Sequence, residues 1–301
     1  MRVFITGASG HIGSAVIPEL LAAGHQVVGL ARSDASAAAV TALGAEVQRG
    51  SLDDLDGLRD AASASDGVIH LAFKHQEMNS GDFEAAVAAD LRAIEVIGEA
   101  LVGTDKPLVG TSGTLMLLFG GVEGVGTEAD AGESGPRIDA ENAVIALAEQ
   151  GVRSSVVRLP PTVHSSLDRT GFVPALIRFA RDKGHAGFVG DGANRWPAVH
   201  TLDAAHLYRL ALEGAPAGTR LHAVGDEGVP FREIAAVIGR HLDLPTESIP
   251  AEDVGAYFDY LAFFVSLDNP TSSARTQELL DWHPTRPGLL EDLDEGHYFA
   301  N

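Results

Sequence analysis

The sequence predicts an α/β protein: a doubly wound parallel sheet of about seven strands, with helices on both faces and a smaller interleaved C-terminal lobe. Two observations support this fold class. From residue 2 to residue 160, short apolar runs alternate with longer amphipathic runs, as in repeated strand–helix–strand units. In addition, the glycine-rich segment TGASGHIG (6–13) lies between the first apolar run and the first helical pattern.

The first half of the chain contains most of the expected sheet. Apolar runs rich in Val, Ile and Leu predict strands within residues 2–6, 26–31, 45–50, 67–73, 107–113 and 154–160. Apolar residues at helical spacing predict helices at 11–24, 35–44, 55–64, 83–103 and 137–151. Several of these helical runs stop at a glycine, a common helix terminator.

After residue 165 the order of elements changes. The pattern predicts helices at 172–184 and 230–244, an extended piece that begins at 196 and runs into a helix ending at 214, and a strand at 219–225 that returns to the sheet. No low-complexity linker separates two halves, so the lobes should be interleaved. We expect one domain at 1–165 with 199–225 returning to it, and a substrate-binding lobe at 166–198 and 226–301.

Composition excludes several classes of protein. Acidic residues outnumber basic ones by 42 to 21, for a net charge of −21, which disfavours nucleic acid as a partner. The chain lacks cysteine, and no apolar run of about 18 residues suggests a membrane span. A strand pattern starting at residue 2 leaves no room for a signal peptide, so we expect a cytoplasmic protein. We also expect no metal site, because no metal-ligand spacing occurs. The absence of a G-x-S-x-G motif disfavours a serine hydrolase.

The glycine segment predicts a dinucleotide site. Gly7 permits the tight turn, Gly10 lets the backbone approach a pyrophosphate, and Gly13 lets the helix pack close to the sheet. The anion then lies on free N–H groups at the helix start. The remaining residues expected to contact the cofactor in this loop are Ser9, His11 and Ile12.

The end of the second strand indicates which dinucleotide binds. An NAD site usually has an acidic residue here for the ribose 2′-hydroxyl, but this chain has Ala31 followed by Arg32 and Ser33. An arginine can hold a 2′-phosphate with two hydrogen bonds, so we expect NADP(H). Asp53, just after the third strand, is placed to meet the adenine edge.

Several further segments resemble one enzyme family. In order, TGASGHIG, VIHLAF, TSG, RLPPTVH and WPAVHTLDAA resemble the extended or atypical short-chain dehydrogenases/reductases of the NAD-dependent epimerase/dehydratase type. The resemblance covers essentially the whole chain. It implies cofactor contacts from Leu71, Ala72, Phe73, Thr111, Pro160, Pro161 and Val163. It also implies a substrate pocket lined from the smaller lobe, and we expect substrate contacts from Thr114, His75, Trp196 and His200.

The chain departs from this family at its catalytic pair. The family's tyrosine protonates the carbonyl oxygen, and a lysine four residues later holds the nicotinamide ribose. All four tyrosines here lie after residue 200, and none has a lysine four residues on. Aligning Glu141 with the acid common in that family's helix puts Glu133 and Arg137 in the two places. Arg137 can donate to ribose hydroxyls, but its pKa stays too high for proton transfer.

The proton donor is therefore an open question. Glu133 beside Arg137 would have a lowered pKa and be ionised at neutral pH. His164 lies just past the expected nicotinamide contact and is the best candidate on its ordinary pKa. Ser112 fits the family's strand-five hydroxyl, which hydrogen-bonds the substrate carbonyl, but it needs a relay to supply a proton.

These observations predict an NADP(H)-dependent oxidoreductase that reduces a carbonyl, or oxidises the matching alcohol, on a small or medium organic substrate. Ser112, Glu133, Arg137 and His164 are the expected catalytic residues. Two alternatives stay open: an NADP(H)-binding sensor without turnover, and a nucleotide-sugar epimerase or dehydratase, which would also need the tyrosine. A homodimer through the long helices 83–103 and 137–151 is open as well.

Overall fold

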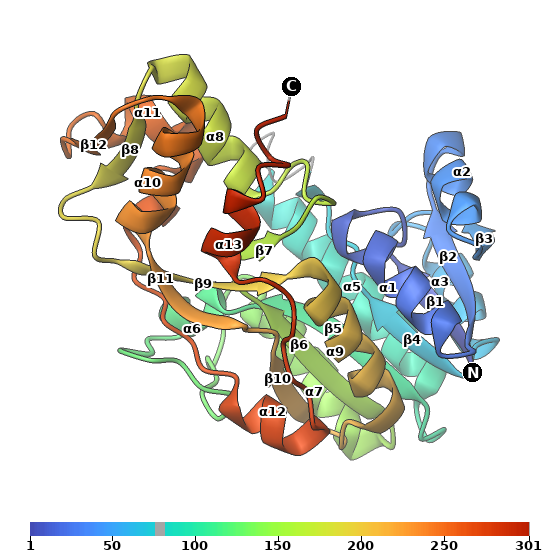
Figure 1. Cartoon of the computed structure of the whole chain (residues 1–301). Coiled ribbons are helices and arrows are strands. Elements are labelled where there is room, and N and C mark those ends of the chain that lie inside the picture. The colour runs from blue at the N-terminus through green and yellow to red at the C-terminus, as the bar shows by residue number, and fades with distance from the viewer. Residues whose placement is uncertain (76–81, 301) are drawn as a thin grey trace.

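The computed structural model describes residues 1–75 and 82–300 and has a seven-stranded sheet at its centre (Figure 1). Every neighbouring pair of strands in it is parallel. The chain moves outward from β1 on one side and returns to β4 on the other, so the predicted doubly wound sheet is confirmed. In order across the sheet, the strands are β10 (Thr219–His222), β6 (Arg153–Leu159), β5 (Pro107–Gly113), β4 (Gly67–His70), β1 (Arg2–Thr6), β2 (Gln26–Ala31) and β3 (Glu46–Arg49).

Helices cover both faces of this sheet, and each face has its own hydrophobic core. One core gathers side chains of α1 (His11–Ala22), α2 (Asp34–Ala42) and α9 (Thr201–Gly214). The other gathers side chains of α3 (Leu55–Ser63), α5 (Phe83–Leu101) and α7 (Ile138–Ala146), which continues into a 3₁₀ turn at Leu147–Gln150. The α1–α9 contact joins two helices 190 positions apart in sequence, because both pack on the same face.

A smaller lobe lies beside the carboxyl edge of the sheet, at the upper left of Figure 1. A three-stranded sheet extends into this lobe. Its central strand is β9 (Arg195–His200), which lies between β7 (Thr162–His164) and β11 (Asp226–Pro230). A parallel pair, β8 (Ala186–Val189) and β12 (Thr246–Ile249), lies at its far end. Its helices are α8 (Phe172–Lys183), α10 (Phe231–Leu242), α11 (Val254–Phe258) and α13 (Leu289–Asp294), with short 3₁₀ turns at Asp259–Leu261 and Phe264–Ser266. These elements share a third core.

The structure differs from the expected segmentation at the C-terminal end. Helix α12 (Ala274–Leu280) and Trp282, assigned above to the lobe, pack against the sheet domain. Trp282 is fully buried, and its indole N–H donates to the Asp203 carbonyl at 3.0 Å. A short helix, α6 (Leu115–Phe119), also follows β5 where no element was expected. In the described part of the chain, no helix is long and apolar enough to cross a membrane.

Candidate active site

The glycine loop has the close approaches expected of its glycines. Gly7 has φ of 69°, and a Cβ atom there would lie 2.8 Å from the Ala72 nitrogen. A Cβ on Gly13 would lie 2.4 Å from the Gly7 oxygen. Gly10 caps α1 without a side-chain hydrogen bond, so no side chain competes for the N–H groups that begin this helix. This backbone fits a pyrophosphate group.

Thr6 ties the loop after β4 to the glycine loop. Its Oγ1 accepts hydrogen bonds from the amides of Leu71 (3.2 Å) and Ala72 (3.1 Å), and it contacts His70 Nδ1 at 2.9 Å. His70 is buried and holds Asp90 at 3.0 Å through its other ring nitrogen. Thr6 therefore holds the glycine loop and the loop after β4, 65 residues further along the chain, side by side at one edge of the sheet. The family resemblance implies that the cofactor binds at this edge.

The residues expected around the adenosine end lie at the carboxyl ends of β2 and β3. Arg32 is exposed and directly follows the buried Ala31. Ser33 caps α2, and its hydroxyl accepts from the Ser36 amide at 3.2 Å. The Asp53 carboxylate accepts from Lys74 at 2.8 and 2.9 Å, which joins the third strand's end to the loop after β4.

Arg137 lies on the same edge. It caps α7 with φ of 64°, just before the helix in which the sequence placed it. Its Nη2 donates to the Thr111 carbonyl at 3.2 Å, and its guanidinium carbon lies 4.1 Å from the centre of the Phe73 ring. An arginine over an aromatic face is stabilised by the ring's quadrupole. The cation is therefore held at the carboxyl ends of β4 and β5.

Glu133 is not positioned by Arg137. Residues 133–137 precede α7 as irregular backbone, so the helical spacing expected between the two side chains is absent. Glu133 is exposed, and its carbonyl accepts from Asn142 Nδ2 at 3.1 Å. Arg137 contacts Phe73 instead of Glu133.

The hydroxyls of Ser112 and of Thr114, which directly follows β5, are buried, and that of Thr111 is half-buried. Ser112 is 4% exposed. Thr111 Oγ1 donates to the His70 carbonyl and contacts the Tyr208 hydroxyl, each at 2.8 Å. Thr114 is fully buried and donates to Asn269 at 2.7 Å. The substrate contacts expected of the Ser112 and Thr114 hydroxyls therefore stay predictions, since both side chains are buried in this structure.

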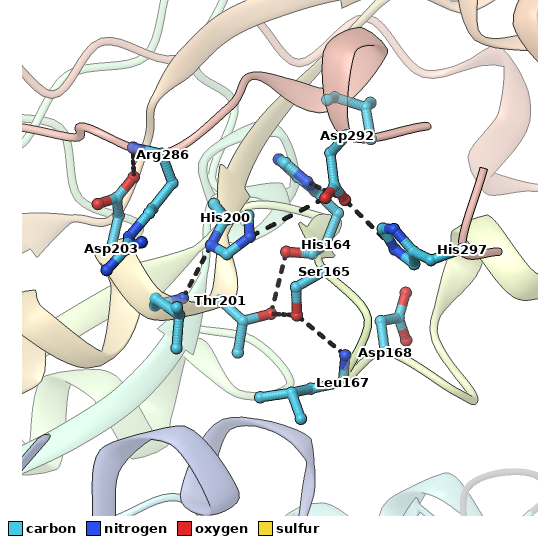
Figure 2. A network of polar contacts seen from close by, with 12 residues as sticks. His164, Ser165, Leu167, Asp168, His200, Thr201, Asp203, Arg286, Asp292 and His297 are labelled. Atoms are coloured by element: carbon cyan, nitrogen blue, oxygen red, sulfur yellow. Dashed lines mark hydrogen bonds and ion pairs between the residues drawn. The ribbon is translucent and has the colours of Figure 1, made fainter. Parts of the chain in front are cut away.

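His164 is also sealed inside the protein. It is fully buried, and its Nδ1 lies 2.9 Å from Asp292 Oδ2 on α13 (Figure 2). Figure 2 shows that the rings of His200 and His297 approach the same carboxylate, at 4.0 and 3.8 Å. His164 has no exposed atom in this structure, so its predicted role as proton donor has no open path to a substrate here and stays a prediction.

The other residues predicted to contact substrate or nicotinamide lie either in the core of the smaller lobe or near His164 and Asp292. Trp196 is fully buried in the lobe core against Phe172 and Phe231, so it does not line a pocket. His200 packs edge-on against His164 and accepts from the Leu202 amide at 3.2 Å. The nicotinamide contacts expected after β6 are only partly accessible: Pro160 is buried, and Pro161 and Val163 are half-buried.

His11 links the glycine loop to this network. Its Nε2 contacts Thr201 Oγ1 at 2.8 Å, and Thr201 in turn donates to the His164 carbonyl at 3.0 Å. Burial, followed by the nearby His164 and His200, lowers the pKa of His11 to about 4. The side chain therefore braces the two lobes as a neutral ring.

The lowered pKa of His11 predicts acid sensitivity. Because the unfolded chain takes up this proton near pH 6.5 and the folded one near 4, stability contributed above 6.5 is lost as pH falls toward 4. At pH 5 the loss is on the order of 2 kcal/mol. Thermal unfolding at pH 7.5 and pH 5 should show a smaller drop for His11→Asn than for wild type. The exposed control His283→Asn should keep the full drop; equal drops in all three proteins would contradict this assignment.

One carboxylate–histidine set lies close together although no metal spacing was expected. Potential ligand atoms of Asp292, Glu295 and His297 all lie within 4.8 Å of one another. The Asp292 oxygen nearest His297 already contacts His164, and Glu295 is exposed. Asp292 is thus held by His164, whereas His297 Nε2 lies 3.8 Å from it and has no hydrogen-bond partner among the described residues. Asp292 and Thr6 carried no signal in the sequence, since each acts through a partner at least 64 residues away.

The sheet and its glycine loop define a protein of the Rossmann dinucleotide-binding class. The model of the NAD dependent epimerase/dehydratase family matches residues 3–131. A Schizosaccharomyces pombe protein, described as uncharacterized, is 46% identical over 99% of this chain and 100% of its own length. A Saccharomyces cerevisiae protein with the same description is 44% identical over 97% and 98%. The chain belongs to the NAD-dependent epimerase/dehydratase family.

More distant similarities agree with this membership. A Dictyostelium discoideum sterol-4-alpha-carboxylate 3-dehydrogenase, decarboxylating, is 28% identical over 77% of this chain and 74% of its own. A UDP-glucuronic acid 4-epimerase from Bacillus cereus, solved with UDP-glucuronic acid and NAD, superposes with a TM-score of 0.75 at 18% identity. That superposition covers 99% of this chain and 98% of the epimerase and shows a shared fold.

Proposed function

We propose that the protein is an NADP(H)-dependent oxidoreductase that interconverts a carbonyl and an alcohol on a small or medium organic substrate. The observation that carries the proposal is the position of Arg137, which lies over Phe73 and donates to Thr111 at the edge where the glycine loop opens. A fixed cation there suits the ribose and carboxamide end of a nicotinamide dinucleotide. The names of two relatives, the sterol carboxylate 3-dehydrogenase and a 2-alkyl-3-oxoalkanoate reductase of Stenotrophomonas maltophilia, support this reaction class.

Each group of residues has a separate task in this proposal. The backbone around Gly7, Gly10 and Gly13 binds the pyrophosphate, and Arg32 binds the 2′-phosphate. Arg137 donates to the nicotinamide ribose and keeps positive charge beside the reacting carbonyl. When bound, the reduced nicotinamide supplies the hydride. A carbonyl bound here must also receive a proton, which Arg137 cannot provide.

The direct test mixes the purified protein with NADPH or NADH and a panel of aldehydes and ketones, and follows the loss of reduced-nicotinamide absorbance. Turnover with NADPH supports the proposal. Tight NADPH binding by fluorescence, without turnover of any panel member or of the matching alcohols with NADP⁺, would favour a sensor. Turnover of nucleotide sugars without net change in NADPH would favour an epimerase.

Arg32→Ala should change the choice of cofactor. Loss of a charged contact to the 2′-phosphate is expected to weaken NADPH binding about 10-fold to 100-fold, and to leave NADH binding nearly unchanged. Fluorescence titration with both nucleotides measures this. The control Arg59→Ala removes another exposed arginine, one that pairs with Asp56 and Glu99 away from the glycine loop, and should alter neither affinity. Equal weakening of both nucleotides by Arg32→Ala would argue against NADP(H) selectivity through Arg32.

A further inference from the structure

His75 lies beside Arg137 on the ring of Phe73, and this ring is called the platform below. Its backbone N–H donates to the Phe73 carbonyl at 3.0 Å, and its ring meets the Phe73 ring edge-on at 5.2 Å. The guanidinium of Arg137 covers the same Phe73 ring at 4.1 Å. One aromatic ring thus carries both a fixed cation and an imidazole.

This platform is fixed against the glycine loop. Leu71 and Ala72 directly precede Phe73, and their backbone N–H groups donate hydrogen bonds to Thr6 Oγ1. Gly7 packs so closely against Ala72 that a Cβ atom on Gly7 would have no room. A dinucleotide lying on the glycine loop therefore passes the segment that ends at His75. The position follows from the strand ends meeting at one edge of a parallel sheet.

The other proton-transfer candidates are either buried or out of contact with Arg137 among the described residues. His164 is fully buried against Asp292, and Ser112 is 4% exposed. Glu133 is exposed in a loop with no contact to Arg137 among those of the described residues. His75 is exposed, carries an imidazole that can take up and release a proton, and lies against Phe73 beside Arg137.

The charges around His75 favour its neutral form. Partial burial lowers the pKa of His75 most, Arg137 lowers it further, and Asp90 on α5 opposes both. Next to it, Lys74 is paired with Asp53. The imidazole should therefore gain and lose its proton below its ordinary pKa of about 6.5.

We propose that His75 exchanges the proton with the substrate oxygen, the task that tyrosine performs in the family. In reduction, the carbonyl carbon takes a hydride from the reduced nicotinamide while its oxygen takes the proton of the His75 imidazolium. The products are the alcohol, the oxidised nicotinamide and neutral His75. In oxidation, neutral His75 accepts the hydroxyl proton. This inference rests on the proposed oxidoreductase function and adds its proton donor.

The first test is independent of substrate and maps histidine modification by diethyl pyrocarbonate with mass spectrometry. His75 should react in the free protein, and saturating NADP⁺ should slow its modification at least about tenfold if the nucleotide covers the platform. The exposed His283 is the internal control and should react equally with and without NADP⁺. An unchanged rate at His75, with NADP⁺ shown to be bound, would overturn the inference.

The second test is kinetic and uses NADPH with a carbonyl from the panel. Reduction by wild type should fall as pH rises above the pKa of His75, because the donor is the imidazolium. His75→Asn should lower kcat/KM by about 100-fold or more and remove this pH dependence, while NADPH affinity stays unchanged. Added imidazole should partly restore His75→Ala, which a purely structural role would not allow. The control is His283→Asn.

The outcomes separate this inference from the proposed function. If wild type turns over and His75→Asn keeps both the rate and the pH dependence, the inference fails and the oxidoreductase stands. If wild type binds NADPH and transforms no panel member in either direction, the oxidoreductase fails and the proton role fails with it. Protection of His75 would then mark a cofactor contact alone.

Discussion

Glu141→Ala should lower the thermal midpoint by roughly 5–8 °C, because it leaves the Arg158 charge without a carboxylate partner inside the protein. Arg158 is 1% exposed and bonds both Glu141 oxygens, at 2.5 and 3.0 Å. Arg220 reaches the same carboxylate at 2.7 Å. Burial acts to raise the Glu141 pKa, but contacts with Arg158, Ser112 and Arg220 outweigh it and lower the pKa. Removing one partner of such a pair costs about 3–5 kcal/mol.

Controls separate this effect from loss of any ion pair. Glu46→Ala removes the partner of Arg2 at the surface and should leave the free energy of unfolding nearly unchanged, because solvent screens exposed ion pairs. In the double variant Glu141→Ala/Arg158→Ala, the loss should be smaller than the sum of the single losses, because neither charge is left alone. Additive losses would mean that the two groups do not depend on each other. Urea unfolding of wild type, Glu46→Ala, both single variants and the double variant measures these differences.

The main sheet could be predicted because its signals are local. Each strand is a short apolar run bounded by turn residues, and β1, β2 and β5 begin and end where the pattern placed them. The two small strands at the far end of the lobe, β8 and β12, could not be predicted from the sequence. Strand β8 gains its partner, β12, from 60 residues further along the chain, and no alternation of its own marks it. Trp282 likewise joins the core of the sheet domain from far along the chain, where its indole donates to the Asp203 carbonyl.

The candidate site was predictable where backbone geometry decides it, as at Gly7 and Gly13. The sequence predicted the site less well where a side chain has several potential partners. His164 looked like a free imidazole in the sequence, yet Asp292 binds it from 128 residues away. Arg137 was expected to face Glu133, but the helix begins one residue after it, and Phe73 offers the cation an aromatic face. Sequence spacing alone cannot rank such distant partners.

Gly13→Ala should weaken NADPH binding on the order of 100-fold, the largest effect expected from adding a single methyl group. The new Cβ would lie 2.4 Å from the Gly7 oxygen and 2.7 Å from the Ala8 oxygen. Both neighbours are backbone atoms, so relief requires the loop or the start of α1 to move. Either movement shifts the amides that should bind the pyrophosphate, since their positions are set by this close packing.

Gly214→Ala is the matched control, because a Cβ there meets nothing within 4 Å. It should leave both NADPH affinity and thermal stability nearly unchanged. The informative comparison is made at a temperature where circular dichroism shows the Gly13→Ala protein still folded, with affinity measured by nucleotide fluorescence. If that folded variant binds NADPH as tightly as wild type, the pyrophosphate does not lie on this loop. The roles assigned to Arg32, Arg137 and His75 would then lose their common reference point, because all three were placed relative to a nucleotide on the glycine loop.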